Sequence, residues 1–436
     1  MIDLIIENGK IVSHNKVINS DIAIKNGKIF RIGKLKKVKS KDRIDASGLH
    51  ILPGVFDTQV HFREPGNTKK ENLKTGSLSA VAGGVTTVFD MPNNKPSITT
   101  NKLFKEKLRK AKNRMYCNYA FYFGAEKDNI KEINKAEKLD GCCGIKVFVG
   151  SSTGTLLVSN YKDIGKIMKN TRKIISFHSE DEAELNRRRN YIKKNDPSSH
   201  PRWRNEVTAM KSTRNLINLA NRIKRKIHIL HISTGDEINV LKRQKKYVSC
   251  EVTPQHLILS SPSCYKNLST LAQMNPPIRN GKHKNILRKA FKRGQFDVIG
   301  SDHAPHLLSE KALRYPKSPA GMPGVQTLLP ILLNEVSKKF ISINDVVRLT
   351  SYNPKKIFKV KNKGLIKKGY DADFTLVDLN KNQKISNKMI KSKCGWTPFH
   401  GMNIKGWPVG TMIMGKKVFW KDKLLSKPIG QPLKFN

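Results

Sequence analysis

The stretch Pro53–Gly66, PGVFDTQVHFREPG, decides how the rest of the chain is interpreted. A proline-glycine pair predicts a turn, and the β-branched and aromatic residues after it predict a short buried strand. Gln59 and His61 alternate along this strand, so both side chains should lie on one face at its end. That geometry suits a metal ion, and Arg63, the next residue on that face, suits an anionic substrate group. A single strand-end histidine is as often a simple hydrogen-bonding residue, so the ends of other strands decide the question.

Seven further strand-like runs follow, separated by segments of helical length. Eight strands with helical crossovers over roughly 300 residues predict a (β/α)8 TIM-type barrel, whose active sites lie at the C-terminal strand ends. A doubly wound open sheet is the alternative, but no glycine-rich phosphate turn follows the first strand. GSSTG at 150–154 lacks the Lys-Ser/Thr ending of a P-loop and is interpreted as an active-site loop. The eight runs are 55–62, 85–91, 118–124, 144–149, 174–178, 227–232, 248–253 and 297–302.

The two ends of the chain differ from the middle in their predicted secondary structure. Residues 1–52 contain short strands with tight turns, and Asn8-Gly9 and Asn26-Gly27 predict hairpins. Residues 364–436 resemble them, so we expect the two ends to join into one small β-sandwich outside the barrel. The predicted division is therefore a barrel of residues 53–363 with a sandwich built from both flanking segments.

The charge of the chain invites a nucleic-acid interpretation that the sequence does not favour. Lys and Arg number 83 against 34 Asp and Glu, which gives a formal net charge of +49. The basic residues are spread along the chain without an aromatic-interleaved basic block, and the abundance of Lys, Asn and Ile suggests an AT-rich genome. We therefore expect a solvated lysine surface and no specific nucleic-acid site, although this surface would attract acidic small substrates.

Cysteine usage and the N-terminus point to the cytoplasm. The six cysteines show no CxxC spacing, so they are interpreted as reduced thiols. The N-terminal residues lack the basic and apolar regions of a signal peptide, and no uncharged run reaches the ~18 residues of a membrane span. The sequence predicts a soluble cytoplasmic protein without a membrane partner.

Six of the eight predicted strands bring a ligand-type or anion-binding side chain to one rim of the barrel. Each has a structural explanation when considered alone: Lys146 could form a buried ion pair, and Asp302 could cap a helix. Their convergence on the face where barrels place their chemistry favours a functional site. These residues are Gln59, His61, Arg63, Asn93, Lys146, His178, His231 and Asp302, followed directly by His303 and His306.

These residue types suit a hydrolytic metal site. Histidine and carboxylate ligands with open positions are typical of zinc or a similar divalent ion. Lys146 is a poor ligand as an ammonium group, but carbon dioxide would convert it to a carbamate whose two oxygens can bridge two metals. Asp302 would then hold one metal and accept a proton during hydrolysis.

Taken together, the motifs resemble those of the dihydroorotases, a family of cyclic amidohydrolases, over nearly the whole chain. ADFTLVDL and CGWTPFHG are similar to the trailing β-sandwich of that family. The carrying motifs are DTQVHFREPG (57–66), AGGVTTVFDMPN (82–93), GIKVFVGSSTG (144–154), FHSED (177–181), HPRWR (200–204), LHIS (230–233), CEVTPQH (250–256), MNPPIR (274–279), SDHAPH (301–306) and GMPGVQTLLP (321–330).

The resemblance implies a metal site with one or two zinc ions. His61 matches the second histidine of a His-x-His pair that binds the first metal together with Asp302. Lys146 matches the carboxylated lysine that bridges the metals, and His178 and His231 match the ligands of the second metal.

The resemblance also implies a substrate and a reaction. Arg63 and Asn93 match residues that hold the substrate carboxylate, Asn275 and His306 match further substrate contacts, and the GMPG loop offers backbone groups to the ring. The implied reaction is the reversible conversion of dihydroorotate to N-carbamoyl-aspartate in pyrimidine biosynthesis. In it Asp302 moves a proton between the attacking water and the leaving ring nitrogen.

Gln59 departs from the family pattern, because most members have a histidine there. An amide oxygen is a weaker zinc ligand, so three interpretations stay open: two metals with Gln59 as a weak or outer ligand, one metal at Lys146, His178 and His231, or a non-catalytic paralogue. The retention of the other site residues favours an active enzyme.

Related activities and partners also stay open. Allantoinase and dihydropyrimidinase-type enzymes share the barrel, the lysine and the metals, but Arg63 favours a substrate that carries a carboxylate. A non-catalytic scaffold subunit of aspartate transcarbamoylase is the alternative from another class. The resemblance leaves open a homodimer and an association with that transcarbamoylase.

Overall fold

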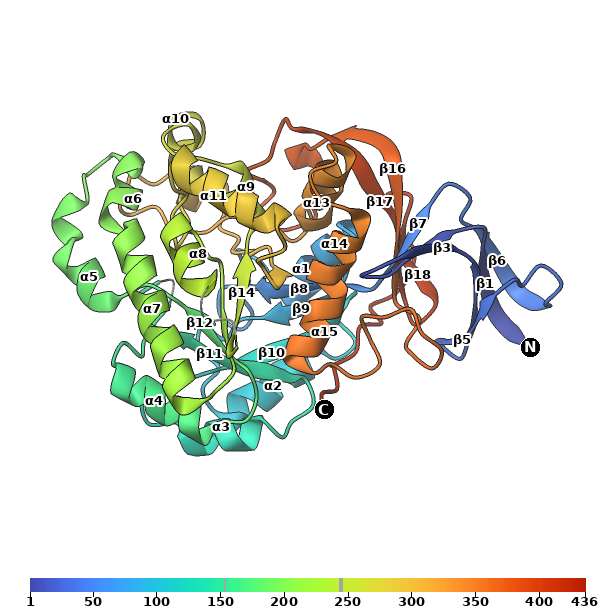
Figure 1. The fold of residues 1–436 in the computed structure, drawn as a ribbon, viewed down its shortest axis with the longest axis horizontal. Helices are drawn as coiled ribbons and strands as arrows, with labels where there is room; N and C mark the ends of the chain where they lie inside the picture. Colours follow the sequence, from blue (N-terminus) through green and yellow to red (C-terminus); the bar gives the residue numbers. More distant parts are fainter. Residues whose placement is uncertain (153, 243–245) are drawn as a thin grey trace.

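Eight short strands, buried along nearly their whole length, form one parallel sheet at the centre of the molecule (Figure 1). The computed structural model describes residues 1–152, 154–242 and 246–436. The sheet order follows the chain from β8 to β15, as expected for a barrel of βα units. The strands are β8 Val55–Val60, β9 Val85–Asp90, β10 Asn118–Gly124, β11 Cys142–Phe148, β12 Ile175–His178, β13 Ile227–Ile229, β14 Val248–Val252 and β15 Val298–Ile299.

The eight predicted runs are confirmed, with one systematic difference at their ends. β13 and β15 each stop three residues before the predicted end. His231 has φ 37° and Asp302 has φ 45°, and these left-handed conformations end the extended backbone. The chain therefore bends away from the sheet where its polar side chains begin.

A short bridge between the first and last strands nearly closes the barrel. Val60, the last residue of β8, pairs in parallel with His303, just beyond β15. The N–H of His61 donates to the carbonyl of His303 at 2.8 Å, and the N–H of His303 donates to that of Gln59 at 3.3 Å. The two predicted polar strand ends farthest apart in sequence thus become neighbours.

Helices follow the barrel strands and cover the outside of the sheet (Figure 1). Several begin with a side-chain cap; Asn72, for example, accepts the N–H of Thr75 at 2.8 Å. The helices are α1 Leu73–Ala82, α2 Asn101–Ala111, α3 Ile130–Ala136, α4 Tyr161–Asn170, α5 Glu182–Arg187, α6 His200–Trp203, α7 Glu206–Ile223, α8 Gly235–Lys242, α9 Pro254–Ile258, α10 Ser263–Leu268, α11 Gly281–Lys292, α12 Leu308–Lys311, α13 Leu328–Ser337, α14 Ile343–Val347 and α15 Asn353–Phe358. Single 3₁₀ or π turns are η1 Arg189–Tyr191, η2 Pro197–Ser199, η3 Ser269–Ala272, η4 Arg348–Tyr352 and η5 Asn387–Met389.

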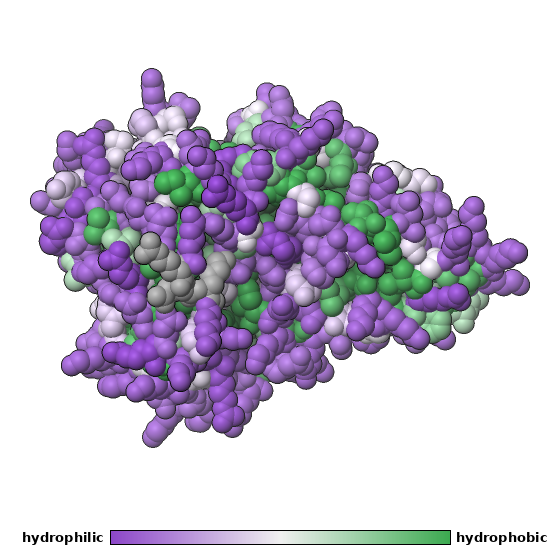
Figure 2. All heavy atoms as spheres, in the orientation of Figure 1, coloured by the Kyte–Doolittle hydropathy of each residue, from purple (hydrophilic) through white to green (hydrophobic). Residues whose placement is uncertain are grey.

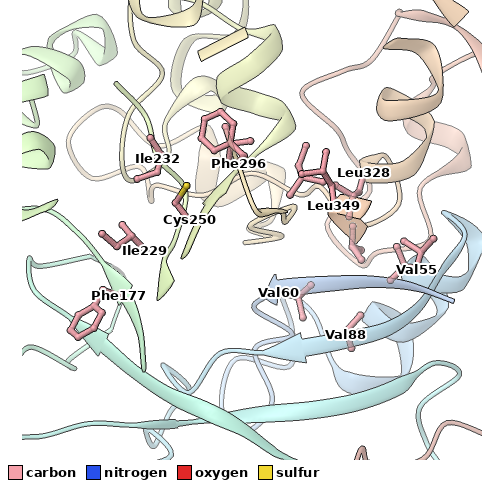
Figure 3. Close-up of a cluster of buried hydrophobic side chains, with 14 of the residues drawn as sticks. Val55, Val60, Val88, Phe177, Ile229, Ile232, Cys250, Phe296, Leu328 and Leu349 are labelled. Carbon is pink, nitrogen blue, oxygen red and sulfur yellow. The ribbon is translucent and has the colours of Figure 1, made fainter. Parts of the chain in front are cut away.

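The main hydrophobic core lies between the sheet and its helices. Figure 3 shows part of it, in which Val55, Val60 and Val88 from β8 and β9 face Leu328 and Leu349 from the helical side. Strands covered on both faces favour continuous apolar and β-branched runs, and this is the pattern that made them recognisable in the sequence. The core gives the strand ends a rigid base.

The two ends of the chain form a pair of mixed sheets beside the barrel (Figure 1). β7 pairs antiparallel with β16, with Leu52 opposite Thr375, so both ends of the chain share one sheet, as predicted. A separate hydrophobic cluster, which includes Ile24 and Phe374, contains residues from both sheets. One sheet has the order β5-β4-β1-β6 and the other β19-β18-β17-β16-β7-β2-β3. Their strands are β1 Ile2–Glu7, β2 Lys10–Val12, β3 Val17–Asn19, β4 Asp21–Lys25, β5 Lys28–Gly33, β6 Ser40–Asp45, β7 His50–Pro53, β16 Phe374–Lys384, β17 Asn403–Ile413, β18 Lys416–Trp420 and β19 Lys423–Leu424.

One of the two predicted hairpins is wrong. Asn26-Gly27 joins the antiparallel strands β4 and β5, and both of its residues have positive φ, as a tight hairpin turn requires. Asn8-Gly9 instead carries the chain from β1 in one sheet to β2 in the other, so the strands on either side do not pair. The division into a barrel of residues 53–363 and flanking sandwich segments stays a prediction.

The surface is dominated by hydrophilic side chains, with apolar residues in small groups on the face that Figure 2 shows. All six cysteines are buried and form no disulfide. Among the described residues, no helix is long and apolar enough to cross a membrane. The cytoplasmic location stays a prediction.

Candidate active site

Nine of the ten predicted site residues line one small cavity at the C-terminal ends of the barrel strands. The tenth, His306, lies directly behind this cavity, where its Nε2 is 3.2 Å from Nη2 of Arg63. Ser152 of the predicted active-site loop lies in the wall, and Thr153 lies outside the described residues. The predicted residues in the wall are Gln59, His61, Arg63, Asn93, Lys146, His178, His231, Asn275 and Asp302; Phe148, Ser152, Ala304, Ala320 and Gly321 complete it.

The strands and the turns after them each contribute part of this group. Gln59 and Lys146 lie within strands and His178 ends one, so the sheet itself fixes their positions. Arg63 and His231 follow strands and have φ of 60° and 37°, a left-handed conformation uncommon for residues with a side chain. Asp302 shares this feature with φ 45°. The backbone is held in a costly conformation at three positions of one site, as functional sites often require.

Asp302 lies at the centre of one half of the site. Its Oδ1 accepts a hydrogen bond from Nε2 of Gln59 at 3.0 Å and lies 3.2 Å from Nε2 of His61. The other ring nitrogen of His61, Nδ1, is 2.7 Å from Oδ1 of Asn93. When Nδ1–H donates to this amide, Nε2 offers its lone pair to the space beside Asp302. Oε1 of Gln59 is buried and has no hydrogen-bond partner among the described residues.

His178 and His231 form the other half. Nδ1 of His178 lies 3.0 Å from Nε2 of His231, and Nε2 of His178 lies 2.9 Å from Oε2 of Glu180. Although burial opposes ionisation, Arg204 and His178 hold the pKa of Glu180 well below its usual range. Glu180 is therefore a carboxylate that accepts a hydrogen bond from Nε2–H of His178. This fixes the tautomer in which the Nδ1 lone pair is directed at His231. Burial lowers the pKa of both histidines, which favours neutral rings.

Lys146 lies in the same cavity, where its Nζ is 4.5 Å from the centre of the Phe148 ring. Burial lowers its pKa to about 7, against the attraction of Asp302 and Glu251. A substantial fraction of this lysine is therefore a neutral, nucleophilic amine near neutral pH.

Arg63 carries the positive charge on the cavity wall. Its Nε donates to the carbonyl of Pro305 at 3.3 Å, and burial lowers its pKa to about 10, so it stays protonated. Neighbouring His306 is a neutral ring, because burial and the nearby cations lower its pKa. Across the cavity Nε2 of His200 lies 2.9 Å from Oδ1 of Asn275, which fixes this amide.

The donor set fits a metal only when Lys146 is counted. Among the described residues, no three His, Cys, Asp or Glu side chains form a group that could hold a metal ion. The cavity instead contains two separate pairs, His61 with Asp302 and His178 with His231. Two imidazole nitrogens on one tetrahedral zinc lie about 3.3 Å apart, given Zn–N distances of about 2.0 Å, and the second pair is close to this spacing.

Several residues at the site had no predicted role. Glu180 and Arg204 occur in the FHSED and HPRWR motifs, and the backbone carbonyl of Ser151 accepts from Nη2 of Arg204 at 2.7 Å. His200 also lies in the second motif. The position of Glu180, two residues after a strand-end histidine, was a usable signal. Nothing in the sequence showed that Arg204 would reach it.

Comparisons with known proteins agree with this fold. The model of the amidohydrolase family matches residues 50–418, so the chain belongs to the amidohydrolase family. In sequence it is a cyclic amidohydrolase related to dihydroorotases. It is 34% identical to the dihydroorotase of Methanosarcina acetivorans, over 98% of this chain and 94% of that protein. It is also 34% identical to the dihydroorotase of Pyrococcus abyssi, over 97% and 96% of the two chains.

Among solved structures the chain is similar to a second group of cyclic amidohydrolases. It superimposes on the L-hydantoinase of Arthrobacter aurescens with a TM-score of 0.95 and 26% identity, over 99% of this chain and all of the other. The dihydropyrimidinase of Brevibacillus agri, at 24% identity and a TM-score of 0.90, shows the same fold. The TIM-type barrel predicted from the sequence is confirmed.

Proposed function

We propose that this enzyme is a dihydroorotase, which interconverts dihydroorotate and N-carbamoyl-aspartate reversibly. The observation that carries the proposal is the guanidinium of Arg63 in the wall of the cavity that holds Lys146 and the histidine pairs. A buried guanidinium is suited to a substrate carboxylate, and the ring of dihydroorotate bears one. The sequence relatives named dihydroorotase support the same substrate.

We also infer that the site holds zinc and that Lys146 carries a carbamate. Each of the two donor pairs, His61 with Asp302 and His178 with His231, needs one further ligand. One carbamate would supply an oxygen to both, and the neutral amine at Lys146 is the form that attacks carbon dioxide and releases a proton as the carbamate forms. Bound zinc would polarise the ring carbonyl and make a water more acidic.

The other side chains would bind the substrate and move a proton. Arg63 and Asn93 would hold the ring carboxylate, while Asn275 and His306 make further substrate contacts. Asp302 would take a proton from the attacking water and return it to the ring nitrogen when the amide bond breaks. In the opposite direction the same carboxylate would take the proton from the nucleophilic nitrogen.

Gln59 bears on how many metal ions are held. Its Oε1 atom is a candidate neutral ligand for the His61 and Asp302 pair, weaker than an imidazole. The proposal therefore favours a firm site at His178 and His231 and a weaker one at Gln59, with activity retained. A non-catalytic scaffold that supports aspartate transcarbamoylase is the outcome to exclude.

A test would use protein purified with zinc and bicarbonate. Zinc per chain and turnover of dihydroorotate would be measured, with allantoin, dihydrouracil and hydantoin as alternative rings. We expect turnover of dihydroorotate alone and its loss in Asp302→Ala. Preferred turnover of hydantoin would favour a second candidate function, that of a dihydropyrimidinase-type cyclic amidohydrolase, which the similarity to L-hydantoinase supports. Bound zinc without turnover of any ring would leave the scaffold role.

A further inference from the structure

A second buried lysine lies behind the cavity. Lys311, the last residue of α12, is completely buried. Its Nζ donates to the backbone carbonyls of Gln273 at 3.2 Å, Pro319 at 2.8 Å and Gly321 at 3.2 Å. An ammonium group has three N–H donors, so each one has a carbonyl.

Burying a charge on Lys311 costs free energy that its surroundings must offset. Among the described residues, no carboxylate forms an ion pair with Lys311, and burial lowers its pKa to about 7. An isolated buried charge is expensive unless hydrogen bonds compensate it. Here the compensation comes from backbone carbonyls of two segments. The centre of the Trp396 ring lies 6.0 Å from Nζ.

These two segments form a distinct part of the cavity wall. Ala320 and Gly321 come from one segment and Asn275 from the other. The N–H of Gly321 donates to the carbonyl of Gln273 at 2.8 Å, so this carbonyl receives two hydrogen bonds. Oγ of Ser318 donates to Oε1 of Gln273 at 2.6 Å, a further link between the segments.

Gly321 shows how closely this wall is packed. Its φ is +144°, and a Cβ added there would meet the carbonyl oxygen of Ala304 at 2.6 Å. The backbone therefore presses against the loop that carries Asp302 and His306. A shift of the segment away from Lys311 would change the shape of the cavity wall at Ala320 and Gly321.

We propose that Lys311 is the positioning residue that fixes the Ala320–Gly321 wall and Asn275, and that it thereby sets how tightly the neutral amide part of a cyclic substrate binds. This inference deepens the proposed function, because the carboxylate of the ring would be held separately by Arg63. The ring itself presents N–H and C=O groups, which backbone groups of a fixed segment match well. Lys311 does not line the cavity, so its hydrogen bonds act on the site through the segments that it holds, while its charge also lowers the pKa of His306.

The test compares Lys311→Met with Lys311→Arg and with a matched control, Lys363→Met. Lys363 is also buried, but it pairs with Asp371 at 2.9 Å and Asp373 at 2.6 Å near the terminal sheets. Hydrogen exchange of the amides in 320–322 and 273–275 would be measured, together with KM, kcat and zinc content.

We expect Lys311→Met to accelerate exchange in both segments and to raise KM about 10- to 100-fold, with a smaller effect on kcat and unchanged zinc. Lys311→Arg, which keeps donors and charge, should recover part of the loss. Lys363→Met should lower thermal stability but leave exchange in these segments and KM unchanged.

Unchanged exchange in Lys311→Met would overturn the proposal, as would a loss of zinc equal to that of a ligand variant. If the wild type turns over no ring, the proposed function fails while the exchange measurement still decides whether Lys311 holds the wall. Should Lys311→Met not fold, the comparison of Lys311→Arg with the wild type carries the same measurements.

Discussion

Nδ1 of His178 faces Nε2 of His231 at a distance of 3.0 Å, and the carboxylate of Glu180 accepts a hydrogen bond from Nε2–H of the His178 ring. Two neutral imidazoles arranged in this way offer lone pairs to one cation. We predict that zinc raises the melting temperature of the protein and that His231→Ala loses most of this shift. Calorimetry with and without zinc would measure it, with His14→Gln as a control away from the cavity. An equal shift in His231→Ala would contradict the assignment.

Glu180 should control metal affinity through the ring that it orients. In Glu180→Gln the carboxylate that fixes the His178 tautomer is lost, so we expect zinc to bind about 10- to 100-fold more weakly. Competition with a chelator would measure the dissociation constant. Glu335→Gln removes another buried carboxylate, paired with Arg288 at 2.6 Å, and should leave zinc affinity unchanged.

Carboxylation of Lys146 should depend on pH. Burial lowers its pKa to about 7, so the amine is largely protonated below this pH and largely neutral above it. We expect protein stripped of carbon dioxide to regain activity with bicarbonate increasingly from about pH 6 to about pH 8. Native mass spectrometry should then show the added mass of one carbon dioxide, absent in Lys146→Arg. A wild type without this mass would argue against the carbamate.

Arg63 should distinguish rings with a carboxylate from neutral rings. Arg63→Gln removes the guanidinium, and we expect KM for dihydroorotate to rise about 10- to 100-fold, as a charge-assisted interaction is lost. Inhibition by neutral dihydrouracil should change much less. Arg43→Gln, a change in the N-terminal strands, serves as the control. Equal losses for both ligands would mean that Arg63 supports the cavity rather than the carboxylate.

Asp57 should make stability depend on pH. Burial raises its pKa to about 7, helped by Glu251 and opposed by hydrogen bonds from Ser301 and Gln59. The unfolded chain releases this proton near pH 4, so between about pH 4 and pH 7 the folded state holds the extra proton and stability falls as pH rises. Urea unfolding at about pH 5 and pH 8 should show a loss of up to roughly 3 kcal/mol that Asp57→Asn reduces. Identical losses in both proteins would contradict the shift.

The barrel could be predicted because its strands are covered on both faces, which leaves a run of apolar residues that local sequence reveals. The polar residue after each run was equally visible, and so nine of the ten predicted site residues lie in the wall of one cavity.

What the sequence concealed depends on contacts between distant segments. Arg204, just after α6, reaches Glu180, just after β12, and Lys311 meets three carbonyls from two loops. Asn8-Gly9 has the composition of a hairpin turn, yet the strands beside it pair with other partners. Local pattern describes which conformation a segment favours; it does not show which segment it will meet.

The pairing of β7 with β16 has a consequence for the order in which the protein can form. Leu52 and Thr375 lie opposite each other but are 375 − 52 = 323 positions apart in the chain. At about 5–20 residues per second on the ribosome, the first strand waits on the order of tens of seconds for the second. During that interval β7 has an unpaired edge, a surface that favours aggregation. The edge of β7, a strand in the first seventh of the chain, is therefore protected only once β16, in the last part of the chain, has been synthesised.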